Sequence, residues 1–114
     1  MLSPNRTAVV VTAKQPFLEW LHSADPTSHR LTLADLNRDP TIYLLPEAQD
    51  EEEARASLVE VCEEIFEVQL EGWFRVPELW PGDRSLTAFQ QWFECRIHFM
   101  IVDLCDDPLL DEEI

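Results

Sequence analysis

The sequence predicts an α+β fold that is mostly helical, and three stretches of the chain carry this prediction. Two are short apolar runs, at about 8–13 and 41–45, with the β-branched and aromatic residues typical of strands. The third is a long segment at about 51–71, in which apolar residues recur at helical spacing. With 114 residues, of which 46% are hydrophobic, the chain is long enough to bury one core. We therefore expect a single domain over 1–114, with an irregular acidic tail from about 106.

A short helix is expected directly after the first strand. Pro16 suits the first helical turn because an N–H at that position would be unpaired in any case. Phe17, Trp20 and Leu21 then follow at helical spacing, which predicts a helix that ends near residue 23.

A second short helix is expected after Thr32. The hydroxyl of Thr32 can accept a hydrogen bond from the amide of Asp35, while the Asp35 carboxylate reaches back. This helix must be short, because Pro40 disfavours helical geometry at the residue before it. The strand at 41–45 follows and is stopped by Pro46. A strand, a helix and a strand in this order are compatible with parallel, right-handed pairing of the two strands.

The helix at about 51–71 has the clearest pattern in the sequence. Asp50 and Glu53 form a capping box at its start, and Gly72 offers a left-handed cap at its end. The apolar face is formed by Leu58, Val61, Cys62, Ile65, Phe66 and Val68. The opposite face carries the acid row, which consists of Glu60, Glu64, Glu67 and Glu71. We expect the apolar face to pack on the strands and the acid row to point to water.

The segment from 85 to 104 fits two structures. Cys95, Ile97 and Phe99 alternate with Arg96 and His98, as in a half-buried strand. One narrow helical stripe instead unites Leu86, Phe89, Phe93, Ile97, Met100 and Leu104. Because periodicity over the longer window is the better signal and no Gly or Pro interrupts the stretch, we predict one helix over about 85–104. A third strand at 95–103 is the alternative.

The charge of the chain limits the classes of partner. Acids number 23 against 8 bases, for a net charge of -15, which excludes a phosphate-tracking nucleic-acid binder and a polybasic membrane anchor. The charge lies in two segments: residues 47–71 hold ten acids and one base, and residues 103–114 hold six acids and no base. A partner attracted by charge would have to engage one of these segments.

The cysteines and the N-terminal sequence predict a cytoplasmic protein. The three cysteines have no closely paired spacing, and no basic region followed by an apolar run marks a secretion signal. No stretch is apolar for long enough to cross a membrane.

The sequence offers no catalytic residue, no metal ligand set and no cofactor site. The three cysteines lack the spacing of a zinc site, and no local nucleophile signature is present. Glu94 and His98 would share one face of a helix, but a carboxylate-bridged metal centre needs inward acids, whereas the acid row lies opposite the apolar face.

The candidate partner-binding residues are the acid row together with Trp80 and Arg84. The acid row is held on a rigid helix, and Trp80 and Arg84 lie in a loop at 71–84 that is rich in proline and aromatic residues. Trp and Arg are enriched at binding hot spots. The alternatives are that the acids only keep the protein in solution and that Trp80 covers the core.

A resemblance to known proteins rests on short segments spread over nearly the whole chain. They are 39–47 (Asp-Pro-Thr-Ile-Tyr-Leu-Leu-Pro-Glu), Ile65-Phe66-Glu67, Gly72-Trp73, Trp80-Pro81, Phe89-x-x-Trp92-Phe93-Glu94 and Val102-Asp103-Leu104. On these segments the chain resembles a group of small acidic bacterial proteins with no assigned function. The resemblance implies a bacterial, cytoplasmic protein and carries no catalytic residue, cofactor or substrate.

Three hypotheses about function follow. The first is a small acidic protein-interaction module that binds another protein or a second copy of itself as a homodimer. The second is an acidic inhibitor or immunity-type protein that neutralises a basic partner, such as a nuclease, with its acid row. The third is a small enzyme whose site forms only in three dimensions, although nothing in the sequence points to one.

Overall fold

A computed structural model describes residues 5–105 and shows an α+β fold, as the sequence predicts. The predicted acidic tail from about 106 lies outside the described residues. The strands are β1 (Arg6–Ala13), β2 (Thr41–Pro46) and β3 (Phe93–His98). The helices are α1 (Gln15–Ala24), α2 (Leu33–Leu36), α3 (Glu51–Trp73) and α4 (Leu86–Trp92), with single 3-10 turns at Pro26–Ser28 and Pro77–Leu79.

The three strands form an antiparallel sheet in the order β2-β1-β3. The expectation of parallel pairing between the first two strands is wrong, because β1 and β2 run antiparallel with Val9 opposite Tyr43. The chain between them goes out through α1 and returns through α2 to the same end of β1. The side chain of Asn37 holds this return in place, since its amide group makes two hydrogen bonds to the backbone of Ala13. A crossover to the other end of β1 is therefore not formed.

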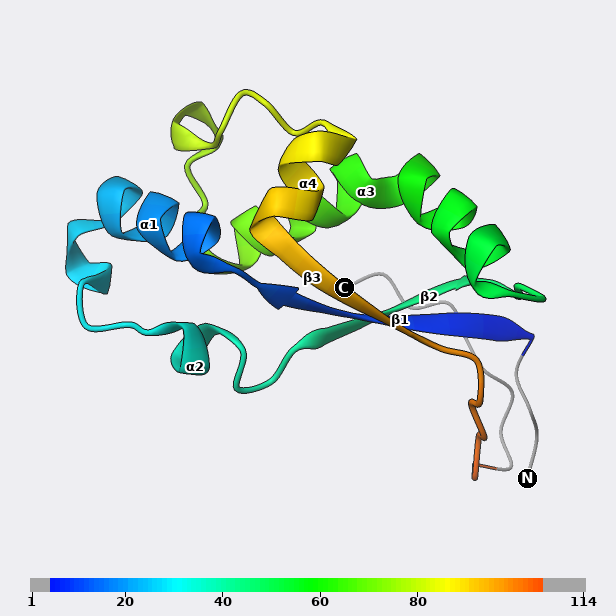
Figure 1. Ribbon diagram of the computed structural model, residues 1–114. Coiled ribbons are helices and arrows are strands. Elements are labelled where there is room, and N and C mark those ends of the chain that lie inside the picture. The colour runs from blue at the N-terminus through cyan, green and yellow to red at the C-terminus, as the bar shows by residue number, and fades with distance from the viewer. Residues whose placement is uncertain (1–4, 106–114) are drawn as a thin grey trace.

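The core lies between one face of the sheet and the helices α1, α3 and α4, which Figure 1 shows above the strands. β1 is the central strand, and its inward residues Thr7, Val9 and Val11 are fully buried. Thr7 is polar but satisfied, because its hydroxyl accepts a hydrogen bond from the N–H of Ala48 at 2.9 Å. This contact fixes the chain just before α3 begins. On the other face of the sheet, Ile42 is exposed.

The predicted helix over 85–104 is wrong beyond Trp92, and the alternative of a third strand is right with the bounds Phe93–His98. Phe93 has extended dihedral angles (φ -134°, ψ 148°), yet its N–H still donates to the carbonyl of Phe89. The same residue thus ends the helix and begins the strand, and no connector is needed. The switch is favourable because β1 gains a second strand partner over Ala8–Ala13.

Phe93 also explains why both periodic patterns coexist in this segment. Its ring lies 5.1 Å from the ring of Phe66, 5.2 Å from that of Phe89 and 5.5 Å from that of Phe17. A helical spacing places Phe89 and Phe93 in the core, and a strand spacing then places Cys95 and Ile97 on the inward face of the sheet. The residues of the helical stripe share one helix face in the structure only as far as Phe93, where the strand begins.

The long helix predicted at about 51–71 is confirmed as α3. Asp50 caps it by accepting from the N–H of Glu53 at 2.8 Å, while the Glu53 carboxylate accepts from the N–H of Gln49. The buried face is formed by Ala54, Leu58, Cys62, Ile65, Phe66 and Leu70. Val68, which was expected on this face, is exposed and its place is taken by Leu70.

The predicted left-handed cap at Gly72 is also wrong. α3 continues through Gly72 to Trp73, and the N–H of Phe74 donates to the carbonyl of Leu70 at 2.8 Å. No glycine in the described chain has a positive φ. The helix ends because Phe74 is extended and packs against the core.

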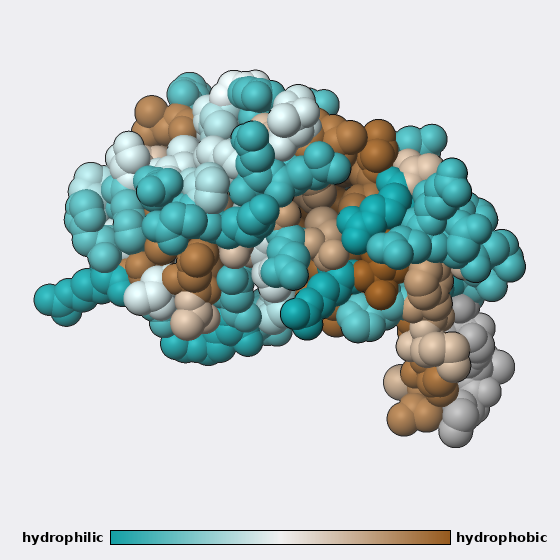
Figure 2. Space-filling view, in the orientation of Figure 1, coloured by the Kyte–Doolittle hydropathy of each residue, from teal (hydrophilic) through white to brown (hydrophobic). Residues whose placement is uncertain are grey.

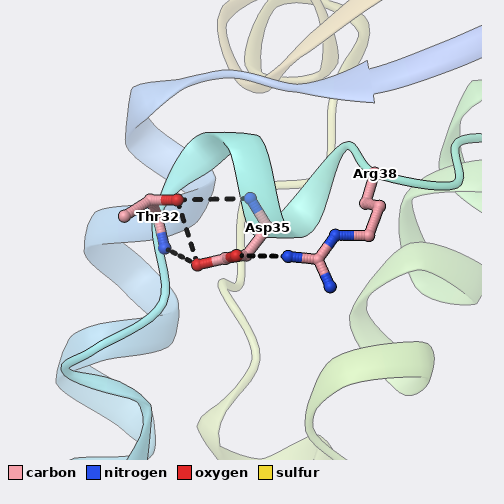
Figure 3. A network of polar contacts seen from close by, with 3 residues as sticks. All are labelled: Thr32, Asp35 and Arg38. Carbon is pink, nitrogen blue, oxygen red and sulfur yellow. Dashed lines mark hydrogen bonds and ion pairs between the residues drawn. The ribbon is translucent and has the colours of Figure 1, made fainter.

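The short helix α2 begins with the reciprocal cap that the sequence predicts (Figure 3). The N–H of Asp35 donates to the Thr32 hydroxyl, and the Asp35 carboxylate accepts from the Thr32 N–H at 2.9 Å. The bond from the Thr32 N–H, and a second one from the Thr32 hydroxyl to the same carboxylate at 3.0 Å, lower the pKa of Asp35 from its ordinary value, with a smaller contribution from the charge of Arg38. The cap positions Asn37 at the end of β1.

Candidate functional site

The acid row lies on the exposed side of α3 and borders a shallow depression. The depression has a volume of about 500 Å³, and its lining residues are Glu60, Glu63, Glu64, Glu67, Val68, Glu71 and Trp80. All four residues of the acid row thus face one hollow, together with Trp80 from the following loop. We call this hollow the acidic depression.

Trp80 reaches the acidic depression because hydrogen bonds hold its loop against the helices. The indole N–H of Trp20, on α1, donates to the carbonyl of Leu79 at 2.9 Å. The indole N–H of Trp80 itself donates to the carbonyl of Phe74 at 2.7 Å. The ring of Trp80 is partly buried and packs on the core. The ring therefore covers the core, as the alternative interpretation of Trp80 predicts, and it also lines the acidic depression. Its role in binding a partner stays a prediction.

Arg84 lies against the acid row and partly neutralises it. Its Nε is 3.8 Å from a carboxylate oxygen of Glu67, and its Nη1 donates to the carbonyl of Pro81 at 2.8 Å. The structure therefore brings the six predicted residues together. However, the guanidinium of Arg84 is a counter-ion and loop anchor, and the free charge of the row comes from Glu60, Glu64 and Glu71.

The cysteines differ in exposure and reactivity. Cys62 is buried in α3 and Cys105 is exposed. Burial raises the pKa of the Cys95 thiol to about 11, and the charge of Arg55 opposes part of that rise. A thiol that is protonated at neutral pH is a poor nucleophile, so the position of Cys95 does not favour catalysis.

The residues considered for metal binding are separated by the fold. Glu94 and His98 lie on the strand β3, not on a helix, and four residues along a strand span about 13 Å. Among residues 5–105, no group of three or more His, Cys, Asp or Glu side chains is placed to hold a metal ion.

A second hollow was missed by the sequence analysis. It is a groove of about 560 Å³ beside β3, lined by Lys14, Arg55, Leu58, Val59, Leu86, Phe89, Gln90, Phe93, Glu94 and Cys95. Figure 2 shows apolar surface gathered between α4 and the first half of α3, where this groove lies. The signal in the sequence was the alternation at Cys95 and Ile97, because it predicts the strand whose residues Phe93, Glu94 and Cys95 line the groove.

The segment that follows β3 is also apolar and exposed. Its exposed large side chains are Phe99, Met100, Val102 and Leu104. Within the described residues, no helix combines the length and apolar character needed to cross a bilayer.

No family model, curated protein or solved structure matches the chain. The resemblance to small acidic bacterial proteins therefore stays a prediction.

Proposed function

We propose that this chain is a protein-interaction module whose acidic depression binds a basic surface of another protein. The observation that carries the proposal is that Glu60, Glu64, Glu67, Glu71 and Trp80 border one hollow of about 500 Å³. The carboxylates of Glu60, Glu64 and Glu71 supply attraction for Lys and Arg side chains, and the Trp80 ring supplies a flat apolar contact in the same hollow.

The rigidity of the acid row favours binding. The row occupies four positions of a helix of 23 residues, so its backbone loses no conformational entropy when a partner arrives. Arg84 further restrains Glu67, and two indole hydrogen bonds restrain the loop that carries Trp80. A preorganised surface keeps more of its contact energy as affinity.

The overall charge favours fast encounter with a basic partner. A net charge of -15 attracts a basic protein over a distance comparable with the Debye length, and the clustered acids direct the approach. An inhibitor or immunity-type protein is the narrower form of the same proposal, in which the carboxylates occupy the phosphate-binding surface of a basic enzyme.

The experiment compares capture by two charge-reversed variants that have the same net charge. Glu60→Lys/Glu64→Lys changes the acidic depression without touching the Glu67–Arg84 pair. Glu19→Lys/Glu47→Lys changes exposed acids elsewhere and is the control. Each immobilised protein is incubated with native lysate at low and at high salt, and bound proteins are identified by mass.

We expect a basic protein that the control captures at low salt, that Glu60→Lys/Glu64→Lys does not capture, and that high salt releases. If both variants capture the same proteins, the acidic depression has no role in binding. Circular dichroism of both variants checks that the fold is intact.

A further inference from the structure

The outer edge of β3 has unpaired backbone groups. β3 pairs with β1 on one side, and no strand of the described chain lies on its other side. The N–H of Lys14 donates to the carbonyl of Trp92, which sets the phase of the antiparallel ladder. With this phase, Glu94, Arg96 and His98 direct their N–H and C=O groups to β1. Cys95 and Ile97 direct theirs outward.

Two of the features that usually block edge pairing are absent from this edge, although β3 does carry the charged side chains of Glu94 and Arg96. β3 contains no proline, and its pairing with β1 runs from Phe93 to His98 without a bulge. The groove of about 560 Å³ runs beside it, with Leu58, Val59, Leu86 and Phe89 in its lining. An added strand would satisfy the outward backbone groups, and its inward side chains would cover these four apolar side chains, which share the groove with Lys14, Arg55 and Gln90.

We infer that the occupant is β3 of a second copy of this chain. The two strands pair antiparallel about a two-fold axis at Cys95, so that two three-stranded sheets become one sheet of six strands. Cys95 then lies opposite Cys95 of the other copy, and Phe93 lies opposite Ile97. Cys95 forms a hydrogen-bonded pair with Cys95 of the other copy, and the carbonyl of Phe93 accepts from the N–H of Ile97 of the other copy. The N–H of Phe93 already donates to the carbonyl of Phe89 and takes no part in the new ladder.

The charges on β3 select this register over its neighbours. With the axis at Cys95, Glu94 lies opposite Arg96 of the other copy in a non-hydrogen-bonded pair, where cross-strand side chains are closest. With the axis at residue 94, two glutamates would be opposite each other, and with the axis at residue 96, two arginines would be. Within one chain these side chains form an ion pair, with Arg96 Nε 3.9 Å from a Glu94 carboxylate oxygen. They are 74% and 61% exposed, so each can exchange this partner for the opposite charge on the other copy.

The position of this edge also suits association of two acidic chains. On the sheet face away from the helices, β3 presents the side chains of Glu94, Arg96 and His98, whose summed charge is close to zero. The acid row, by contrast, is on the exposed side of α3. Two copies therefore meet away from their greatest charge. The self-pairing proposal is independent of the acidic depression, and either can fail without the other.

A charge-swap series tests the pairing by sedimentation equilibrium of the full chain at low salt. In the dimer, residue 94 of each copy lies opposite residue 96 of the other, which gives two equivalent pairs. Each single variant, Arg96→Glu or Glu94→Arg, places like charges opposite each other in both of these pairs. The double variant Glu94→Arg/Arg96→Glu restores opposite charges. We expect a wild-type dimer, a dissociation constant raised about tenfold or more in each single variant, and near-wild-type association in the double variant.

The matched control is Arg30→Glu, which makes the same charge change at an exposed residue outside the sheet and should leave association unchanged. A wild type that stays monomeric up to millimolar concentration would overturn the inference, as would a double variant as weak as the single ones. If Arg30→Glu weakened association as much as Arg96→Glu does, the effect would come from net charge and not from the pairing of β3. This result would also overturn the inference.

Disulfide trapping tests the register separately. In the variant Cys62→Ala/Cys105→Ser, Cys95 is the only thiol of the chain. Hydrogen-bonded antiparallel pairs have Cα atoms about 5.5 Å apart, which lies within the range of disulfides. Oxidation by copper–phenanthroline should give a covalent dimer for Cys95. A dimer in solution that yields no covalent product would rule out this register.

Discussion

The side-chain amide of Asn37 pairs with the backbone of Ala13 as a neighbouring strand would. Its oxygen accepts from the N–H of Ala13 at 2.8 Å, and its nitrogen donates to the carbonyl of Ala13 at 3.0 Å. β2 pairs with β1 only as far as Thr41 opposite Val11, so Asn37 completes the ladder at the last residue of β1. One side chain thereby holds the long connection between β1 and β2 at the end of the sheet.

Asn37→Ala is expected to lower the free energy of unfolding by about 1–3 kcal/mol, because it leaves a partly buried donor and acceptor of Ala13 without partners. The control is Gln49→Ala at an exposed position, which should change the free energy by less than about 0.5 kcal/mol. Urea unfolding measures both. A loss in Asn37→Ala no greater than that in the control would show that the two hydrogen bonds do not stabilise the fold.

Two neighbouring residues on α3 test which face of the helix carries the stability. Ile65 is 3% exposed in the main core, so Ile65→Ala should cost about 2–5 kcal/mol through the cavity that it leaves. Glu64 is exposed, and Glu64→Ala should change the free energy of unfolding by less than about 0.5 kcal/mol. Equal losses in urea melts would mean that the buried face of α3 is assigned wrongly.

The indole hydrogen bond of Trp20 should control access to the loop that carries Trp80. Trp20→Phe keeps an aromatic ring but removes the donor to Leu79, so the loop opens more often. We expect trypsin to cleave after the exposed Arg75 several-fold faster than in the wild type. Trp73→Phe, at an exposed position, is the control. Unchanged cleavage in Trp20→Phe would show that this bond does not hold the loop.

The raised pKa of Cys95 predicts a loss of stability at high pH. Burial raises the pKa of this thiol from 9.0 to about 11, so the folded chain holds the proton more tightly than the unfolded chain. The corresponding stability is complete below about pH 9 and is lost as the pH rises towards 11. Burial also raises the pKa of Tyr43, which adds to the loss at the upper end of this range.

The measurement is the free energy of unfolding between pH 8 and about 11 in urea, for the wild type, Cys95→Ala and Cys105→Ala. Cys95→Ala should flatten the decline, whereas Cys105→Ala removes an exposed thiol and should leave it unchanged. Parallel curves for the wild type and Cys95→Ala would contradict the assignment.

Local patterns were sufficient to predict much of the fold. The β-branched run of β1 and the apolar stripe of α3 are each set by residues close together in the sequence, and both elements form where expected. The cap of Thr32 and Asp35 is local as well. Elements that depend on contacts within a few residues can be predicted from the periodicity and the residue types of the sequence.

Contacts between distant segments decided the rest. The chain after Trp92 has a helical pattern, but it becomes a strand because β1 offers a free edge and the ring of Phe93 fits among Phe17, Phe66 and Phe89. The antiparallel course of β2 depends on Asn37, which is 24 residues from its partner Ala13. The periodicity of one segment cannot predict these contacts, because the contacting residues are far apart in the sequence.

One part of the candidate site could be predicted from local sequence patterns, and the other part depends on contacts between distant segments. The acid row follows from the period of one helix, and its members do share one face. The position of Trp80 depends on a bond between Trp20 and Leu79, and the groove beside β3 depends on the strand that the sequence predicts only as the alternative to a helix. Surfaces built from several elements need the tertiary structure.

The association rate of the captured basic protein tests the proposed function most directly. It is measured by stopped flow at low salt with the wild type, with Glu60→Lys/Glu64→Lys and with the control Glu19→Lys/Glu47→Lys. We expect the rate constant to fall about tenfold more in Glu60→Lys/Glu64→Lys than in the control, because both carry the same net charge and only one loses the acid row. Equal rate constants in the two variants would contradict the proposal that the acidic depression is the binding surface.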